Sequence, residues 1–149
     1  MTRSLPSFLG AVFFLTVAGC SSDGGDTPPA PEEPTFTNVV KDVITDRNCG
    51  GPLCHSLTVG GFQLGTKSAL YSALVNQPAS GPKCGHGLDG GGPSPYVRVV
   101  PGNPDESLLY MKLKRIQPCG DSMPNSSTQL SPDKIGLVHD WIADGAKND

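Results

Sequence analysis

Apolar residues recur at helical spacing near the start of the region that is expected to fold. Between Phe36 and Ile44 they follow the i, i+3, i+4, i+7, i+8 pattern of an amphipathic helix. That helix is expected to end just before Cys49. A second, shorter helix is predicted from Lys67 to Val75, because apolar residues again line one face and Thr66 precedes them as an N-cap.

Two further helices are predicted toward the C-terminus, each with proline at its first position. The segment Asn103-Pro104-Asp105-Glu106 is expected to begin a helix that continues through Leu113. Ser131-Pro132-Asp133 begins the last helix by the same logic, and Gly145 ends it. The buried stripe of this helix is expected to comprise Ile135, Val138, Trp141 and Ile142. Only Val97 to Val100 suggests a short extended segment, so the pattern predicts a mainly α domain.

Residues 1–20 predict an export signal of the lipoprotein type. Arg3 supplies the positive charge, and the apolar run from Phe8 to Val17 is too short to span a bilayer comfortably. The following Val17-Ala18-Gly19-Cys20 resembles the lipobox of bacterial lipoproteins, in which the cysteine is lipidated and becomes the first mature residue. We therefore expect a lipid anchor on Cys20. An ordinary secretory signal with a chance cysteine is the alternative.

The residues after the signal predict a tether and then one domain. Residues 21–34 contain no large apolar residue and are rich in proline, glycine and acid, so they cannot bury enough surface to fold. Residues 35–149 are close to the usual size of a single domain. Ser21 follows the lipobox cysteine at the position where an aspartate would resemble a signal for retention in the inner membrane. Its presence therefore favours the outer membrane. The domain is accordingly expected in the periplasm or at the cell surface.

Composition narrows the class of domain. The 19 glycines and 15 prolines of the chain predict a loop-rich fold with a small core, which needs a cofactor or a disulfide as a staple. The net charge of −3 argues against nucleic acid as a partner.

The candidate chemistry lies in Cys49-Gly50-Gly51-Pro52-Leu53-Cys54-His55. Two cysteines followed at once by a histidine are what covalent haem attachment needs, and the usual signature is CxxCH. Here the spacing is CxxxxCH, two residues longer. The sequence predicts one haem c, bound through thioether bonds to Cys49 and Cys54, with His55 as the proximal iron ligand.

Two other interpretations of these cysteines remain open. Cys49 and Cys54 could form a small disulfide loop, with His55 merely an exposed neighbour. The second interpretation is a zinc site, although the regular paired spacings of zinc modules are missing. Its candidate ligands are Cys49, Cys54, His55, Cys84, His86 and Cys119.

Met123 is the candidate for the second iron ligand, because His/Met ligation is typical of electron-carrying cytochromes c. It lies in a polar loop before Pro124 and has no helical stripe to join. Met111 is expected to be a core side chain of a helix. His86 is the competing ligand, since a second imidazole would also bind iron. His139 is expected to be a partly buried histidine with a hydrogen-bond partner.

The remaining cysteines, Cys84 and Cys119, are expected to pair as a disulfide in an oxidising compartment, once the haem takes its two thiols. The bridge would close a loop of about 35 residues and contribute roughly 4 kcal/mol in the chain-entropy model. Pairing is not fixed by sequence, because four cysteines allow three connectivities.

Four stretches together resemble the cytochrome-c-type domains of exported bacterial lipoproteins. They are Cys49 to His55, Val99 to Leu109, Met123-Pro124 and Ser131 to Ala146, and they cover most of the domain. The resemblance implies a class I cytochrome c-like fold, mainly α, with crossing N- and C-terminal helices and the haem in a cleft between loops. It also implies that Cys49, Cys54, His55 and Met123 hold the haem.

The expected function is electron transfer between redox protein partners by a lipid-anchored, single-haem cytochrome c. No acid, base or nucleophile suggests an enzyme, and no small-molecule substrate is evident. Two alternatives remain: a haem-free, disulfide-stapled interaction lipoprotein, and a haem enzyme or gas sensor with one open iron position.

Overall fold

The computed structural model describes residues 30–45, 49, 55, 64–80, 83–84 and 93–149. The chain divides into two compact units, Met1–Ala30 and Pro31–Asp149. Nearly all of the first unit, including the predicted export signal and Cys20, lies outside the described residues. In the described part of the chain, no helix is long and apolar enough to cross a membrane.

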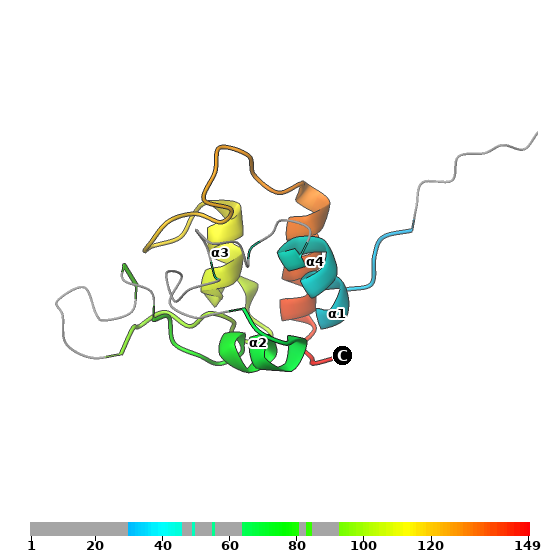
Figure 1. The fold of residues 1–149 in the computed structure, drawn as a ribbon, viewed down its shortest axis with the longest axis horizontal. Coiled ribbons are helices and arrows are strands. Elements are labelled where there is room, and N and C mark those ends of the chain that lie inside the picture. The colour runs from blue at the N-terminus through cyan, green and yellow to red at the C-terminus, as the bar shows by residue number, and fades with distance from the viewer. Residues whose placement is uncertain (1–29, 46–48, 50–54, 56–63, 81–82, 85–92) are drawn as a thin grey trace, which may run out of the picture. The chain divides into compact units, whose positions relative to one another are not determined.

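The second unit is mainly helical, and its described residues contain no strand. The helical elements, in chain order, are α1 (Phe36–Asn38), η1 (Val39–Thr45), α2 (Lys67–Leu74), η3 (Pro104–Glu106), α3 (Leu108–Lys114) and α4 (Pro132–Ala143) (Figure 1). α1 continues directly into η1, which is a π-helix, whereas η3 is a single 3₁₀ turn. The mainly α class expected from the sequence is therefore confirmed.

The first two predicted helices begin where the sequence placed them. Thr35 caps α1 by accepting a hydrogen bond from the Asn38 amide (3.2 Å). Thr66 caps α2 in the same way, through the Ala69 amide (3.3 Å). α2 ends one residue earlier than predicted, because Val75 adopts an extended backbone and forms an isolated parallel bridge with Val99.

The helix predicted from Asn103 through Leu113 is broken at Ser107. Ser107 has an extended backbone (φ −89°, ψ 114°), which separates η3 from α3. The next two amides, of Leu108 and Leu109, donate to carbonyls of the extended segment 97–100, at 3.0 and 2.9 Å. The buried Ser107 hydroxyl accepts from the Val100 amide (2.8 Å). Pairing with this segment replaces the helical bonds, which makes the single-helix prediction wrong.

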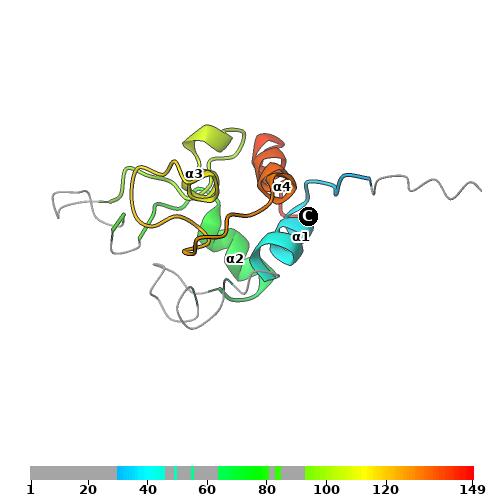
Figure 2. The same cartoon turned by 90° about the horizontal axis from the view of Figure 1, so that it is seen from above.

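The last helix, α4, follows its prediction closely. Pro132 occupies its first position after the extended Ser131, and the chain leaves the helix at Gly145, whose φ of +96° favours glycine. All four residues of the predicted stripe are buried, and Val138 and Ile142 are completely inaccessible. α4 contacts both η1 and α3, so it lies between them in the unit (Figures 1 and 2).

The main core joins the two ends of the domain. The Phe36 ring stacks on the Trp141 indole, with centroids 5.1 Å apart, and meets Tyr71 edge-on at 5.3 Å. Both Phe36 and Trp141 are almost fully buried. The Tyr71 hydroxyl and the Trp141 indole donate to the carbonyls of Ala146 and Lys147, at 2.8 and 2.9 Å. The residues after α4 are thereby fixed to α2 and α4.

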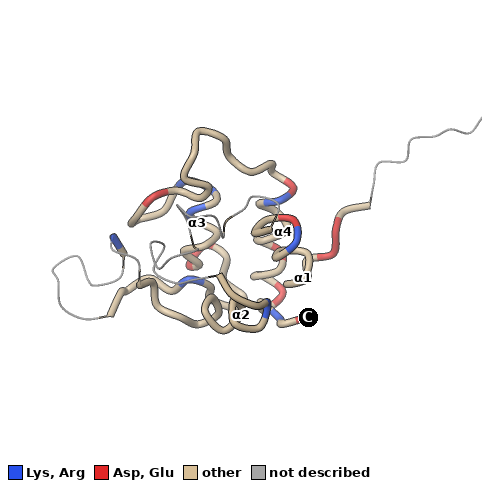
Figure 3. Tube along the Cα trace, viewed as in Figure 1, with Lys and Arg blue, Asp and Glu red and all other residues tan. Residues whose placement is uncertain are grey.

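Charged residues are dispersed over this unit. Lys and Arg positions occur on several separate elements, and Asp and Glu positions lie between them along the described trace (Figure 3). One charged contact joins two core elements, since Lys134 of α4 donates to the Asp42 carbonyl of η1 (2.7 Å).

Candidate functional site

The backbone brings Cys49 and His55 together directly after η1. The Cys49 amide donates to the Ile44 carbonyl of η1 (3.1 Å), which is the five-residue spacing of a π-turn. The His55 amide donates to the Cys49 carbonyl (3.0 Å), and the His55 carbonyl accepts from Leu64 (3.0 Å). π-turns are rare and are often found at functional sites. The first cysteine and the histidine are thus held in one loop.

His55 is buried, with 8% of its surface exposed. Cys49 is half-buried, and its Sγ lies 3.9 Å from the Val43 carbonyl. Cys54, the predicted second thioether residue, lies outside the described residues, as does His86, the competing iron ligand. Burial of an imidazole beside a cysteine is unlike the exposed neighbour expected if these cysteines served only a disulfide loop.

Met123 is half-buried and packs against the main hydrophobic core, although it belongs to no helix. Its amide donates to the Lys112 carbonyl of α3 (3.1 Å), and the bond to Pro124 is cis. The sequence offered no packing role for this side chain, so its contact with the core is a finding of the structure. Met111 differs from expectation: it is only half-buried and belongs to neither core cluster of the described residues.

A disulfide joins Cys84 and Cys119, with a Cα separation of 5.4 Å. It closes a loop of 35 residues and packs with Ala79 and Leu108 in a second, smaller cluster. Because both sulfurs are oxidised, these two residues are removed from the zinc ligand set considered above. Among the described residues, no group of three His, Cys, Asp or Glu side chains is placed to hold a metal ion.

Lys112 is a residue whose importance the sequence did not suggest. It lies on the buried face of α3, only 9% exposed, and its ammonium donates to the carbonyls of Cys119 (3.1 Å) and Asp121 (2.8 Å). Burial lowers the pKa of Lys112, because desolvation disfavours the charged form. The signal available in the sequence was a lysine at a position of the apolar stripe that Leu108 and Leu113 define.

A solvent-exposed ion pair holds the segment between Cys119 and Met123. Lys83 Nζ lies 2.7 Å from one carboxylate oxygen of Asp121 and 2.9 Å from the other. Lys83 lowers the pKa of Asp121, by hydrogen bonding first and by charge attraction second. The disulfide and this pair attach residues 83–84 to the segment between Cys119 and Met123.

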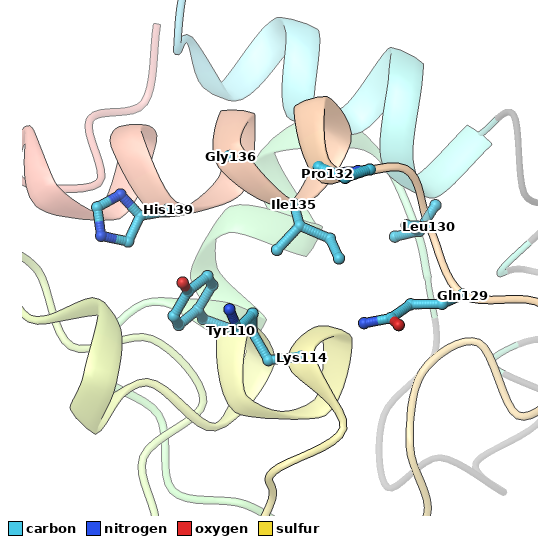
Figure 4. Close-up of a pocket in the computed structure, with 8 residues that line it drawn as sticks. All are labelled: Tyr110, Lys114, Gln129, Leu130, Pro132, Ile135, Gly136 and His139. Carbon is cyan, nitrogen blue, oxygen red and sulfur yellow. The ribbon is translucent and has the colours of Figure 1, made fainter.

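An open pocket of about 570 Å³ lies between α3 and α4 (Figure 4). Ile135 points into it from α4, facing Tyr110 and Lys114 of α3. Its other lining residues are Gln129, Leu130, Pro132, Gly136 and His139. Neither His55 nor Met123 is among them, so this pocket is distinct from the predicted iron ligands.

His139 matches its expectation as a partly buried histidine with a hydrogen-bond partner. Its side chain is 43% exposed, and Nδ1 lies 2.7 Å from the Asp140 carboxylate. The ring also packs at a tilt against Tyr110, with centroids 5.3 Å apart. These contacts account for His139 without a ligand role.

Comparisons of the chain with protein family models, with curated proteins and with solved structures found no match.

Proposed function

We propose that this chain is a monohaem c-type cytochrome, lipid-anchored in the cell envelope, that carries single electrons between protein partners. The observation that carries the proposal is the burial of His55, held by its backbone bond to Cys49. A histidine next to a simple disulfide loop is expected to be exposed, whereas burial suits a residue that ligates a haem iron.

The donor atoms of the candidate site fit a haem iron. Cys49 and Cys54 supply thiols for attachment, His55 supplies an imidazole, and Met123 supplies a thioether. When bound, the haem supplies a reversible one-electron change at iron. The chain's own residues would attach the macrocycle, ligate the metal and exclude water. Because His55 and Met123 would both serve as ligands to the iron, we propose electron transfer and no enzymatic activity.

The fold that we propose is the class I cytochrome c-like one, in which the N- and C-terminal helices cross. The packing of Phe36 from α1 on Trp141 from α4 supports it, because these residues lie 105 positions apart in the chain and join its first and last α-helices. Met123 lies in the loop that begins at Arg115 and joins α3 to α4, which agrees with an iron ligand carried by a loop.

The anchor is proposed on Cys20, followed by the tether over residues 21–34. Such a tether would leave the domain free to meet soluble or membrane-bound redox partners. Replacement Cys20→Ala should leave an unlipidated precursor with its haem site intact. A wild-type N-terminal peptide without acyl mass would rule the anchor out.

A haem-free interaction lipoprotein is the second candidate. It is favoured by the Cys84–Cys119 disulfide and by the direct packing of Phe36 on Trp141, which together give the domain a staple and a core without a cofactor. The two candidates differ in whether the purified protein is coloured.

The test is expression of the full chain with a cytochrome c maturation system, followed by haem staining of a denaturing gel. The proposal expects staining that survives denaturation and is lost in the Cys49→Ala/Cys54→Ala variant. The matched control, Cys84→Ala/Cys119→Ala, should retain it. A folded but colourless wild-type chain would support the second candidate.

A further inference from the structure

One residue of α3, Lys112, holds the whole segment from Cys119 to Met123. Its ammonium donates to the carbonyls of Cys119 and Asp121, while its backbone carbonyl accepts the Met123 amide at 3.1 Å. The start, middle and end of the segment are therefore bonded to a single helical residue.

An apolar side chain would be expected at this position if packing alone mattered. Burying an ammonium costs free energy unless its donors are satisfied, and Lys112 is 91% removed from solvent. The lowered pKa of Lys112 has the same cause. The long side chain of Lys112 carries its ammonium from the core face of α3 to two carbonyls of the following loop. The cost of burial is offset by the hydrogen bonds to the carbonyls of Cys119 and Asp121, which also order that loop.

The loop is shaped to admit this ammonium. Gly120 lies between the two carbonyls and has a φ of +68°. A Cβ at Gly120 would come within 2.7 Å of Lys112 Nζ and 3.0 Å of Cys84 Sγ. The absence of a side chain at Gly120 therefore makes room for the Lys112 contact.

We propose that Lys112 is the positioning residue for Met123, fixing the loop so that the thioether is presented to the haem iron. The inference rests on the proposed function. A ligand that is ordered before binding loses less entropy when it binds, so a fixed loop would favour ligation of the iron by Met123. Lys112 does not touch the iron in this account and acts only through Met123.

The test compares Lys112→Met with Lys114→Met in the holoprotein. Both replace a lysine of α3, but Lys114 is exposed and its ammonium lies over the Tyr110 ring, away from the loop. Lys112→Met should retain covalent haem while losing most of the weak far-red sulfur-to-iron absorption band, and its reduction potential should fall. Lys114→Met should match wild type in both. An unchanged band and potential in a folded Lys112→Met variant would overturn the proposal, as would equal loss in both variants.

A second pair of variants tests the same proposal if the Lys112→Met variant does not fold. Gly120→Ala should displace the Lys112 ammonium, whereas Gly102→Ala has a similar positive φ (+81°) and nothing within 4 Å of the added methyl group. The far-red band should weaken in Gly120→Ala relative to Gly102→Ala, and equal bands would overturn the proposal.

The wild-type spectrum separates this inference from the proposed function. Wild-type protein with covalent haem but no far-red band would overturn the role of Lys112 and leave haem attachment standing. Wild-type protein without haem would overturn both.

Discussion

The aromatic ring of Phe36 lies stacked on the indole of Trp141, with the two planes inclined at 27°. This contact links the first helix of the domain to the last, and both side chains are almost inaccessible to solvent. Pairs of stacked aromatic rings contribute stability beyond the area that they bury. The contact therefore stabilises the packing of α1 against α4.

Phe36→Ala should lower the free energy of unfolding by about 3 to 5 kcal/mol, because a large side chain leaves a cavity in the core. Urea denaturation followed by tryptophan fluorescence measures this loss. Ile116→Ala is the control, since Ile116 is 63% exposed and should change stability by less than about 0.5 kcal/mol. Equal effects of the two substitutions would contradict the packing described.

Loss of the disulfide should also destabilise the domain. The Cys84→Ala/Cys119→Ala variant should lose roughly 4 kcal/mol, because the unfolded chain is no longer constrained over 35 residues. Chemical denaturation measures the change, and peptide mapping under non-reducing conditions should find the cross-linked pair in the wild type. Recovery of both cysteines as free thiols would refute the pairing.

The ion pair of Lys83 and Asp121 predicts a pH dependence of stability. Lys83 lowers the folded-state pKa of Asp121, so the contribution of the pair is present above the unfolded-state pKa of about 3.9 and is lost as the pH falls through the lower folded-state pKa. At low salt and neutral pH, Asp121→Asn should therefore melt at a slightly lower temperature than wild type, and the difference should vanish in acid. A difference that grew below about pH 4 would contradict the sign of this shift.

The proposed ligation of a haem iron by Met123 is tested by two substitutions that preserve side-chain volume. Met123→Leu removes the thioether but keeps most of the packing of Met123 on the core, at a cost below about 1.5 kcal/mol. It should abolish the far-red band of the oxidised protein and lower its reduction potential. Met111→Leu should leave both nearly unchanged. The opposite outcome would assign the ligand to Met111, and an effect of neither would point to His86.

The elements that could be predicted from sequence are those whose signals are local. α4 is an example, because Pro132 begins it, its apolar stripe is regular and Gly145 follows it. The break at Ser107 was not predictable in this way, since it depends on hydrogen bonds to the separate segment 97–100. A local helix pattern cannot show that backbone amides will donate hydrogen bonds to carbonyls of another part of the chain.

The candidate site also combines features with a local sequence signal and features that depend on contacts between separate segments. The proposed attachment motif from Cys49 to His55 is contiguous in the sequence, whereas the contact of Met123 with the core and the hydrogen bonds of Lys112 depend on how α3 meets the following loop. Lys112 lies beside apolar residues on α3, and no local pattern indicates that its ammonium has two carbonyl partners.

Covalent haem attachment is tested most directly by the mass of the proteolytic peptide that contains Cys49, Cys54 and His55, from protein matured in a cytochrome c-producing host. We expect this peptide to be heavier by one haem, with neither cysteine open to alkylation. An unmodified peptide, or one whose two cysteines are joined to each other, would contradict it.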